Sequence, residues 1–229
     1  MSKEMNRREF MKASAATGAV LMTGGLSPAF AQELKPIQLL PPQLDGGRPL
    51  MQVLKDRRST RAYSSKKIPL QILSNLLWAA FGINRPGTNL RTAPSGFFSN
   101  DIYVATAEGV FLYDARANLL NPVLAEDVRN LSGQQYPPPG VYGGYVGEAP
   151  VNLIYVWDRS KKRPHYSEEL NMYHVFTNTG LISQNVYLYC ASEGLVTVVR
   201  SWFNKPALEK KMKLQPEQYA TLVQSVGYP

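Results

Sequence analysis

The strongest constraint on the fold is one long helical stretch, from about Glu168 to Glu193. Its second half is apolar almost all round, a pattern typical of a helix that is buried in the protein and not laid on its surface. Gly194 follows directly, and glycine is the usual residue just past a helix end. We therefore expect this helix to be central, with the other elements built around it.

Shorter elements of both kinds are predicted on either side of this helix. Apolar runs that alternate or have strand length predict strands over residues 101–107, 110–113, 151–157, 195–199 and 219–226, with a hairpin turn at Glu108-Gly109. Helical spacing predicts helices over residues 50–56, 70–81, 125–131 and 206–212. The order is mixed α and β, without an internal repeat.

The first residues have the order of a secretory signal. Asn6-Arg7-Arg8-Glu9-Phe10-Met11-Lys12 is a twin-arginine sequence, residues 13–26 are weakly apolar, and Ala29-Phe30-Ala31 is a small-x-small cleavage site. The alternative, a membrane-spanning helix, needs about 20 apolar residues. This run is shorter and is diluted by Gly, Ser and Thr. We expect export by the twin-arginine (Tat) machinery, cleavage after Ala31, a periplasmic location and no stable membrane insertion afterwards.

Three segments follow from this interpretation. Residues 1–31 would be the signal, residues 32–48 an extended arm rich in Pro and Gly, and residues 49–229 one folded domain. The chain is 44% hydrophobic, which is enough to bury a sizeable core.

The net charge of +8 indicates an anionic partner. Lys and Arg are scattered, however, except in Arg57-Arg58-Ser59-Thr60-Arg61 and Lys161-Lys162-Arg163. No helix-turn-helix, zinc-finger or RNP pattern accompanies them. We therefore expect a small anionic ligand and no nucleic acid.

Side chains for metal or nucleophilic chemistry are scarce. Cys190 is the only cysteine, so no disulfide can form within the chain, and its apolar neighbours indicate a core residue. His165 and His174 are nine residues apart and do not share a helix face, so no metal site is expected. Rossmann, P-loop, HExxH and CxxC patterns are absent, and we expect no catalytic side chain.

The segment from Arg57 to Arg61 carries the clearest ligand signal. It holds three guanidinium groups and two hydroxyls just past a predicted helix end. Arginine binds phosphate oxygens two at a time through charge-assisted hydrogen bonds. An isolated cluster of this kind is more often a solvated basic turn, and the sequence downstream favours the phosphate site.

From Met51 to Pro229 the sequence resembles the FMN-dependent nitroreductase family. It is most similar to the exported branch that shares Arg-Thr-x-Pro-Ser and Val-Gly-Tyr-Pro segments with SagB-type dehydrogenases. The matching segments, in order, are Arg57-Arg58-Ser59-Thr60-Arg61, Leu76-Leu77-Trp78-Ala79-Ala80-Phe81-Gly82, Arg91-Thr92-Ala93-Pro94-Ser95, Asp101-Ile102-Tyr103-Val104, Gly109-Val110-Phe111-Leu112-Tyr113-Asp114, Gly180 with Gln184-Asn185, Ala191-Ser192-Glu193-Gly194-Leu195 and Gln224-Ser225-Val226-Gly227-Tyr228-Pro229.

The resemblance implies an α+β fold with a mixed sheet wrapped by helices, and an obligate homodimer that binds FMN at the subunit interface. The positions implied for the phosphate, ribityl chain and pyrimidine edge of FMN are Arg57, Arg58, Ser59 and Arg61. The positions where the partner subunit would close over the flavin are Pro94 and Ser95. The positions whose backbone amides would approach flavin N5 are Val199, Arg200 and Ser201.

Two departures from the family pattern affect the implied site. After Pro94-Ser95 the family usually carries an Asn and then a Gln before the strand. The loop here is about two residues shorter, so Asn100 is expected to stand in for one of these two. Many relatives continue past Gly-Tyr-Pro with a basic residue near the phosphate. Here Pro229 is the last residue, so the Arg57 cluster is expected to hold the phosphate alone.

The implied activity is hydride transfer through flavin N5, from a reductant to a nitroaromatic or quinone acceptor, by a ping-pong mechanism. Nicotinamide donors are expected to be scarce outside the inner membrane, so the donor stays open. One alternative is a SagB-like dehydrogenase that oxidises a peptide-derived azoline. Another is a non-catalytic periplasmic flavin-binding protein. The segment Tyr136–Tyr145 is interpreted either as a substrate lid or as a Pro-rich surface loop.

Replacing Arg7 and Arg8 with Lys is expected to keep the protein in the cytoplasm, because the export route selects the arginine pair. Immunoblots of periplasmic and cytoplasmic fractions measure the outcome. An unchanged periplasmic yield would contradict export by this route.

Overall fold

A seven-stranded sheet organises the computed structural model, which describes residues 33–93, 98–133 and 144–229. The strands are β1 (Ile37–Gln38), β2 (Asn100–Ala105), β3 (Val110–Asp114), β4 (Leu119–Leu124), β5 (Val151–Asp158), β6 (Val196–Arg200) and β7 (Gln218–Gly227). The helices are α2 (Leu50–Asp56), α3 (Leu70–Phe81), α4 (Tyr145–Glu148), α5 (Glu168–Glu193) and α6 (Lys205–Lys211), with 3-10 turns η1 (Arg129–Gly133) and η2 (Arg159–Lys161).

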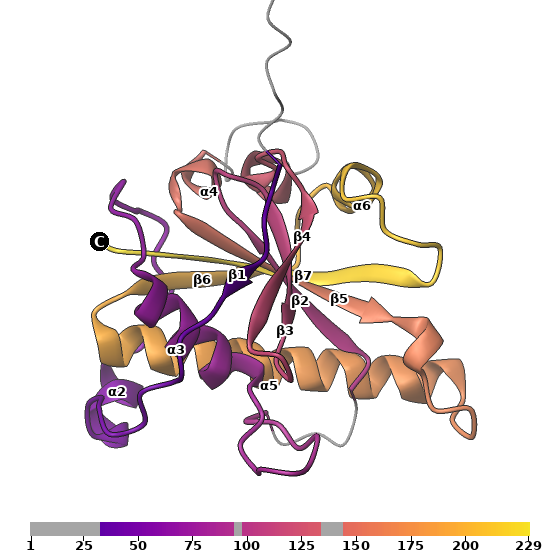
Figure 1. Cartoon of the computed structure of the whole chain (residues 1–229), viewed down its shortest axis with the longest axis horizontal. Coiled ribbons are helices and arrows are strands. Elements are labelled where there is room, and N and C mark those ends of the chain that lie inside the picture. Colours follow the sequence, from indigo (N-terminus) through magenta and orange to yellow (C-terminus); the bar gives the residue numbers. More distant parts are fainter. Residues whose placement is uncertain (1–32, 94–97, 134–143) are drawn as a thin grey trace, which may run out of the picture. The chain divides into compact units, whose positions relative to one another are not determined.

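The strands lie in the order β1-β4-β3-β2-β5-β7-β6, and all of these neighbours pair antiparallel (Figure 1). Parallel pairing occurs within the described ranges as one isolated bridge, between Ser59 and Thr197. The predicted α+β fold is confirmed, and the parallel part of the expected mixed sheet is limited to that bridge. β6 is therefore the last strand of the sheet, and its outer edge faces the Arg57 segment.

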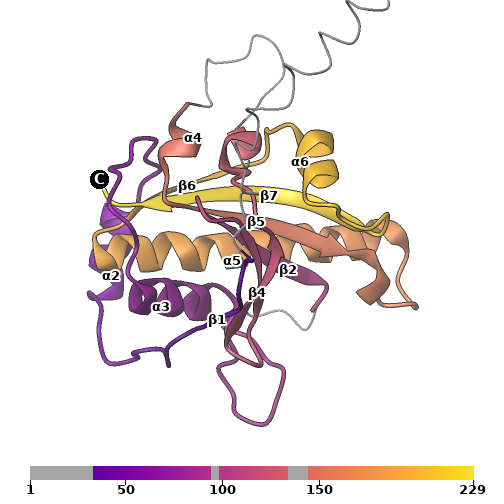
Figure 2. The ribbon, with the colours of Figure 1, turned by 45° about the horizontal axis from the view of Figure 1, so that its top comes forward.

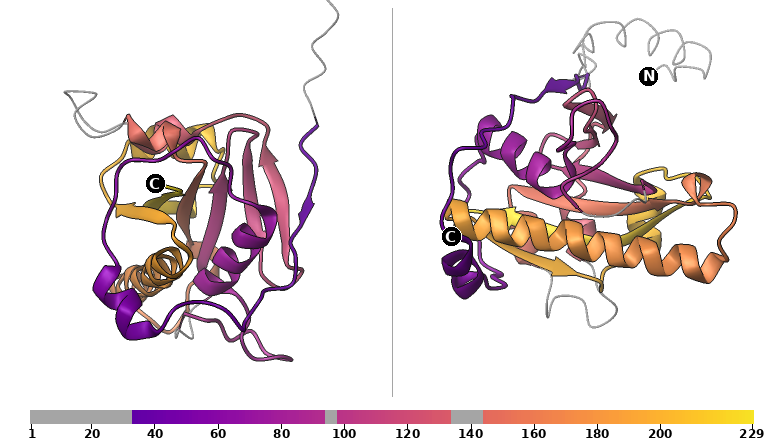
Figure 3. Two further views of the ribbon diagram at one scale, coloured as in Figure 1. Left: turned by 90° about the vertical axis from the view of Figure 1, so that its left-hand side faces the viewer. Right: turned by 90° about the horizontal axis from the view of Figure 1, so that it is seen from below.

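Apolar side chains form a core on each face of the sheet, and β5 contributes to both. All eight of its residues are buried. Leu153 and Tyr155 belong to the core beneath α3 and α5, whereas Ile154 and Val156 belong to the core shared with α6. Figures 2 and 3 show α3 and α5 along one face of the sheet and α6 on the other. Because successive side chains of a strand point to opposite faces, one apolar run supplies both cores.

Helix α5 has the predicted bounds, and both of its ends are capped. The Ser167 hydroxyl accepts a hydrogen bond from the Leu170 amide at 3.1 Å, and Gly194 takes a left-handed φ of 71° past the last turn. The sheet-facing side is buried, for example at Ile182 and Val186. Gln184 on the other side is exposed, so the prediction of burial holds for the inner face only.

The arm before α2 is bound to the domain by specific hydrogen bonds. The Leu40 amide donates to the Ser74 hydroxyl at 3.0 Å, and the Arg48 amide donates to the Ser192 hydroxyl at 2.9 Å. Leu39 is buried in the same core as α3. These contacts place residues 34–48 with residues 49–229 in one compact unit.

The region after β3 differs from the sequence prediction. Residues 119–124 form β4, which was missed because Asn121 and Pro122 interrupt its apolar pattern. Proline has no N–H to donate to a ladder, and the β3–β4 register shifts next to the Phe111–Pro122 pair. The helix predicted over residues 125–131 was wrong: a 3-10 turn begins at Arg129 instead.

None of the helices in the described ranges is both long and apolar enough to cross a bilayer.

Candidate cofactor site

The Arg57–Arg61 segment lies along the outer edge of β6. The Thr60 amide donates to the Thr197 carbonyl at 3.0 Å, and Ser59 forms the parallel bridge to the same residue. The last strand of a sheet otherwise leaves a row of backbone donors and acceptors unpaired. The segment therefore covers part of this edge and is held in a defined position beside it.

Tyr187 of α5 connects this segment to the strand. Its hydroxyl lies 2.7 Å from the Ser59 hydroxyl and accepts a hydrogen bond from the Val199 amide at 3.0 Å. The guanidinium of Arg57 lies over the Tyr187 ring, 5.1 Å from its centroid. Sequence reasoning missed this residue, because Tyr187 stands in an apolar run and its bond to Ser59 spans 128 residues of the chain.

A cavity of about 470 Å³ opens beside Tyr187. The cationic side chains that line it are Arg48, Lys55, Arg57 and Arg58. Asp56 is the acidic lining residue; it pairs with Arg48, whose hydrogen bond lowers the pKa of that carboxyl. In the part of the chain described, no ion pair joins the other three cations to a carboxylate. The cavity therefore carries a positive excess, which suits a phosphate group.

Two predicted residues of the segment lie outside the cavity lining. Ser59 is not part of the cavity lining, but its hydroxyl contacts that of Tyr187, which is part of the lining. Arg61 is exposed and does not line it. Pro94 and Ser95 lie outside the described residues.

The Val199 amide points to the outer edge of β6, where the Tyr187 hydroxyl already binds it. Backbone N–H groups along a strand alternate between its two sides. Ser201 follows the last residue of β6 in a bend, and it is exposed. Of the three predicted residues, Ser201 is the most exposed, and the Val199 amide already has a partner.

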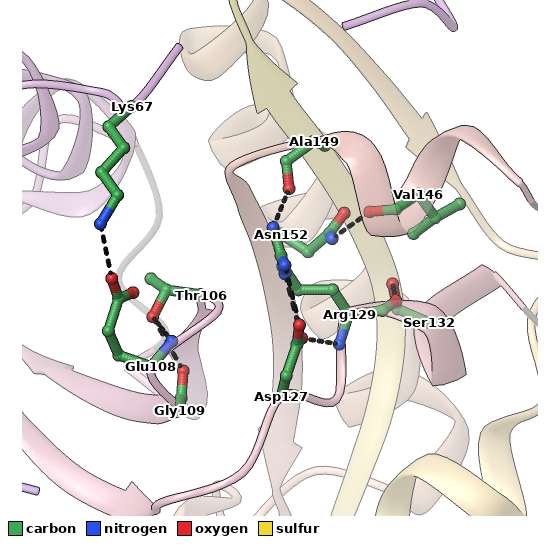
Figure 4. A network of polar contacts seen from close by, with 10 residues as sticks. All are labelled: Lys67, Thr106, Glu108, Gly109, Asp127, Arg129, Ser132, Val146, Ala149 and Asn152. Atoms are coloured by element: carbon green, nitrogen blue, oxygen red, sulfur yellow. Dashed lines mark hydrogen bonds and ion pairs between the residues drawn. The ribbon is translucent and has the colours of Figure 1, made fainter. Parts of the chain in front are cut away.

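The Arg200 side chain points away from this edge and into the domain. It is only 8% exposed and donates to the Ser132 carbonyl at 2.8 Å and to the Ser225 hydroxyl at 3.0 Å. Burial lowers the pKa of this guanidinium. Ser225 in turn bonds Asn152, which donates to the Val146 carbonyl at 2.8 Å (Figure 4). Arg200 therefore connects β6 to η1, and its backbone amide, next to the outward amide of Val199, faces β7.

A second cavity, of about 650 Å³, lies at the end of the sheet drawn in Figure 4. Its walls include Ile68, Phe111 and Leu120. The cations at this cavity are compensated: Lys67 pairs with Glu108, and Arg129 pairs with Asp127. It lacks the uncompensated positive charge of the first cavity, so the first cavity is the better suited of the two to an anionic group.

Asn100 is not brought to the cavity by the fold. It is 2% exposed, and its amide nitrogen donates to the Thr179 hydroxyl at 2.8 Å and to the Val175 carbonyl at 3.4 Å. Its amide oxygen accepts from Asn178 at 2.7 Å. Both donors are used inside the protein, so Asn100 joins β2 to α5 and no donor is left for a flavin.

Cys190 is a core residue, as the sequence indicated. It is 1% exposed, and burial raises the pKa of its thiol, which keeps the sulfur protonated and unreactive. No group of side chains suited to a metal ion occurs within residues 33–93, 98–133 and 144–229.

Comparisons with known proteins agree with this architecture. The sequence model described as the nitroreductase family matches residues 54–228, and a model of the TAT (twin-arginine translocation) pathway signal sequence matches residues 4–24. A nitroreductase-like protein of Methanocaldococcus jannaschii is 28% identical over 186 residues, which are 78% of this chain and 90% of that protein.

Two solved structures illustrate the range of similarity. The crystal structure of a nitroreductase-like protein from Ralstonia eutropha JMP134 is 36% identical, with a TM-score of 0.77, covering 84% of this chain and 89% of that one. A nitroreductase-like protein from Desulfovibrio desulfuricans in complex with FMN is 21% identical, with a TM-score of 0.55, covering 80% of this chain and 87% of that one. The second shows a shared fold.

The Asn100→Ala variant is expected to lose about 1–3 kcal/mol of unfolding free energy, because Asn178 and Thr179 lose a buried partner. Urea unfolding measures the loss, and Asn84→Ala, at an exposed position, serves as the control. FMN affinity of the folded variant should equal that of the parent. A selective loss of FMN binding with unchanged stability would make Asn100 a ligand of the cofactor.

Proposed function

This chain belongs to the nitroreductase family, and from that membership we propose that it binds FMN and transfers hydride between a reductant and a small organic acceptor. Membership makes it an oxidoreductase. The twin-arginine signal directs it to the Tat export route and so to the periplasm. The proposal adds the cofactor, the residues that hold it and the class of acceptor.

The observation that carries the proposal is the basic cavity beside the edge of β6. Lys55, Arg57 and Arg58 line it without carboxylate partners among the described residues. Three such cations favour a dianionic group, and the arginine forks match phosphate oxygens. Riboflavin lacks this group, so the cavity would distinguish FMN from riboflavin.

The residues next to the cavity would orient the rest of the cofactor. A phosphate held by Arg57 and Arg58 would direct the ribityl chain along the β6 edge, toward the exposed Ser201 just past the strand end. A backbone donor at flavin N5 favours the form that carries added negative charge. Bound FMN would supply the hydride chemistry itself, and the chain would position it and limit access of water.

The acceptor is proposed to be a nitroaromatic or a quinone that takes its electrons after the donor has left. A SagB-like oxidation of a peptide-derived substrate and non-catalytic flavin binding are the competing possibilities. An anaerobic screen of electron donors, followed by absorbance, separates them, because only the proposed activity requires both reduction by a donor and reoxidation by a small acceptor.

A homodimer is also proposed, on the basis of exposed apolar side chains in the first half of α5. Met172, Tyr173 and Phe176 are 42%, 62% and 39% exposed, and Leu170 on the preceding turn is 40% exposed. Exposed apolar groups that lie together on one helix mark a surface that another protein covers. A second copy of this chain would cover it and complete the flavin site.

The Phe176→Glu variant is expected to convert the dimer to a monomer, because a carboxylate would be buried at the centre of the interface. Light scattering at low micromolar concentration measures the mass. Val123→Glu, which places the same charge on an exposed apolar position of β4, should remain dimeric. A parent protein that is monomeric while holding FMN at full occupancy would refute the two-chain site.

The Arg57→Ala variant is expected to bind FMN roughly ten- to a hundredfold more weakly, because a charged hydrogen-bond partner of the phosphate is lost. Its affinity for riboflavin should change little. Quenching of flavin fluorescence measures both, and Arg85→Ala, an exposed arginine outside the cavity, is the matched control. Equal preference for FMN in the parent and in Arg57→Ala would contradict the phosphate assignment and, with it, the proposed function.

A further inference from the structure

The hydroxyl group of Tyr187 lies between two parts of the proposed site. It accepts the Val199 N–H at 3.0 Å on one side and faces the Ser59 hydroxyl at 2.7 Å on the other. Tyr187 is 7% exposed, whereas Ser59 is exposed. The phenol therefore sits in the interior, and the serine that it contacts faces outward.

The direction of the Tyr187–Ser59 bond follows from a count of protons. A phenol has one proton to donate, and the Val199 amide uses its acceptor side. A buried donor without an acceptor is costly, and the Ser59 oxygen is the acceptor within reach. Tyr187 therefore donates to Ser59, and the Ser59 proton is free to point outward.

This order forms a chain of donors, from the Val199 amide through the Tyr187 hydroxyl to the Ser59 hydroxyl. Hydrogen bonds in series polarise one another, so each strengthens the next donor. The last donor in the chain belongs to the segment that carries Arg57, and that guanidinium lies over the ring of Tyr187 itself. The side chain of Tyr187 thus contacts two proposed phosphate-binding residues, the charged Arg57 and the neutral Ser59.

We propose that Tyr187 is a positioning residue. Its hydroxyl stands in the cavity wall and orients the Ser59 hydroxyl, 2.7 Å away and just outside the lining, as a donor to the phosphate of the bound flavin. The inference rests on the proposed function and adds Tyr187, a residue of the cavity wall whose hydroxyl is already bound by Val199 and Ser59. It also gives the Val199 amide a role, which is to hold Tyr187 in place.

The Tyr187→Phe variant tests the proposal, because it removes the hydroxyl and keeps the ring beneath Arg57. Affinity for FMN is expected to fall about three- to tenfold, the effect of one misdirected hydrogen bond. Affinity for riboflavin should stay within about twofold. The ratio of the two affinities is the readout, since a loosened fold would weaken both ligands together.

Tyr189→Phe is the matched control. Tyr189 lies two residues further along the same helix, and its hydroxyl donates to the Ile72 carbonyl at 3.3 Å, away from the Arg57 segment. Its removal should leave the ratio of FMN to riboflavin affinity unchanged. Ser59→Ala should lower the ratio, and adding Tyr187→Phe to Ser59→Ala should lower it no further, because both substitutions break one chain of donors.

Three outcomes would overturn the inference. An unchanged ratio in folded Tyr187→Phe shows that its hydroxyl serves packing alone. An unchanged ratio in Ser59→Ala shows that the Ser59 hydroxyl does not bind the phosphate. This second variant gives the test if Tyr187→Phe fails to fold. Additive effects of the two substitutions on the affinity ratio would show that Tyr187 does not act through Ser59. A parent protein that binds neither flavin refutes the proposed function itself, and is thus distinguishable from the failure of Tyr187 alone.

Discussion

The packing of α5 against the sheet is the contact on which the rest of the structure depends. Besides its apolar contacts, the helix makes polar links to three strands of the sheet, β2, β7 and β6. Thr179 bonds Asn100 of β2, the Ser183 carbonyl accepts from Gln224 of β7 at 3.3 Å, and Tyr187 bonds β6. The hydrophobic effect is non-directional, whereas a hydrogen bond requires a particular partner, distance and angle. The three links are directional and fix its position.

The proposed site is a consequence of that fixed position. Once α5 is set, Tyr187 reaches the outer edge of β6 and the Arg57 segment is tied to the same edge through Thr60 and Ser59. The basic cavity forms between the segment, the end of α5 and the start of β6. Its charge is uncompensated because Asp56 is already engaged by Arg48. The geometry and the electrostatics of the site thus have one origin.

Local signals in the sequence predicted the two longest helices well, since Pro69 and Gly82 bound α3, and Ser167 and Gly194 bound α5. Strand β4 was not predicted, because it contains Pro122 and depends on its neighbours β1 and β3 for pairing. The basic segment was identified by composition, and the later segments supplied the family. The roles of Asn100 and Tyr187 were not predictable, because their partners are distant in the chain and only the fold brings them together.

Hydrogen exchange of the mature protein with and without FMN is the sharpest test of the proposed site, because it reports which backbone amides the cofactor protects. We expect added protection in peptides that cover residues 57–61 and 196–202, and little change in those that cover residues 65–68 and 106–111 at the second cavity. Protection confined to the second cavity, with residues 57–61 unaffected, would contradict it and move the flavin to the opposite end of the sheet.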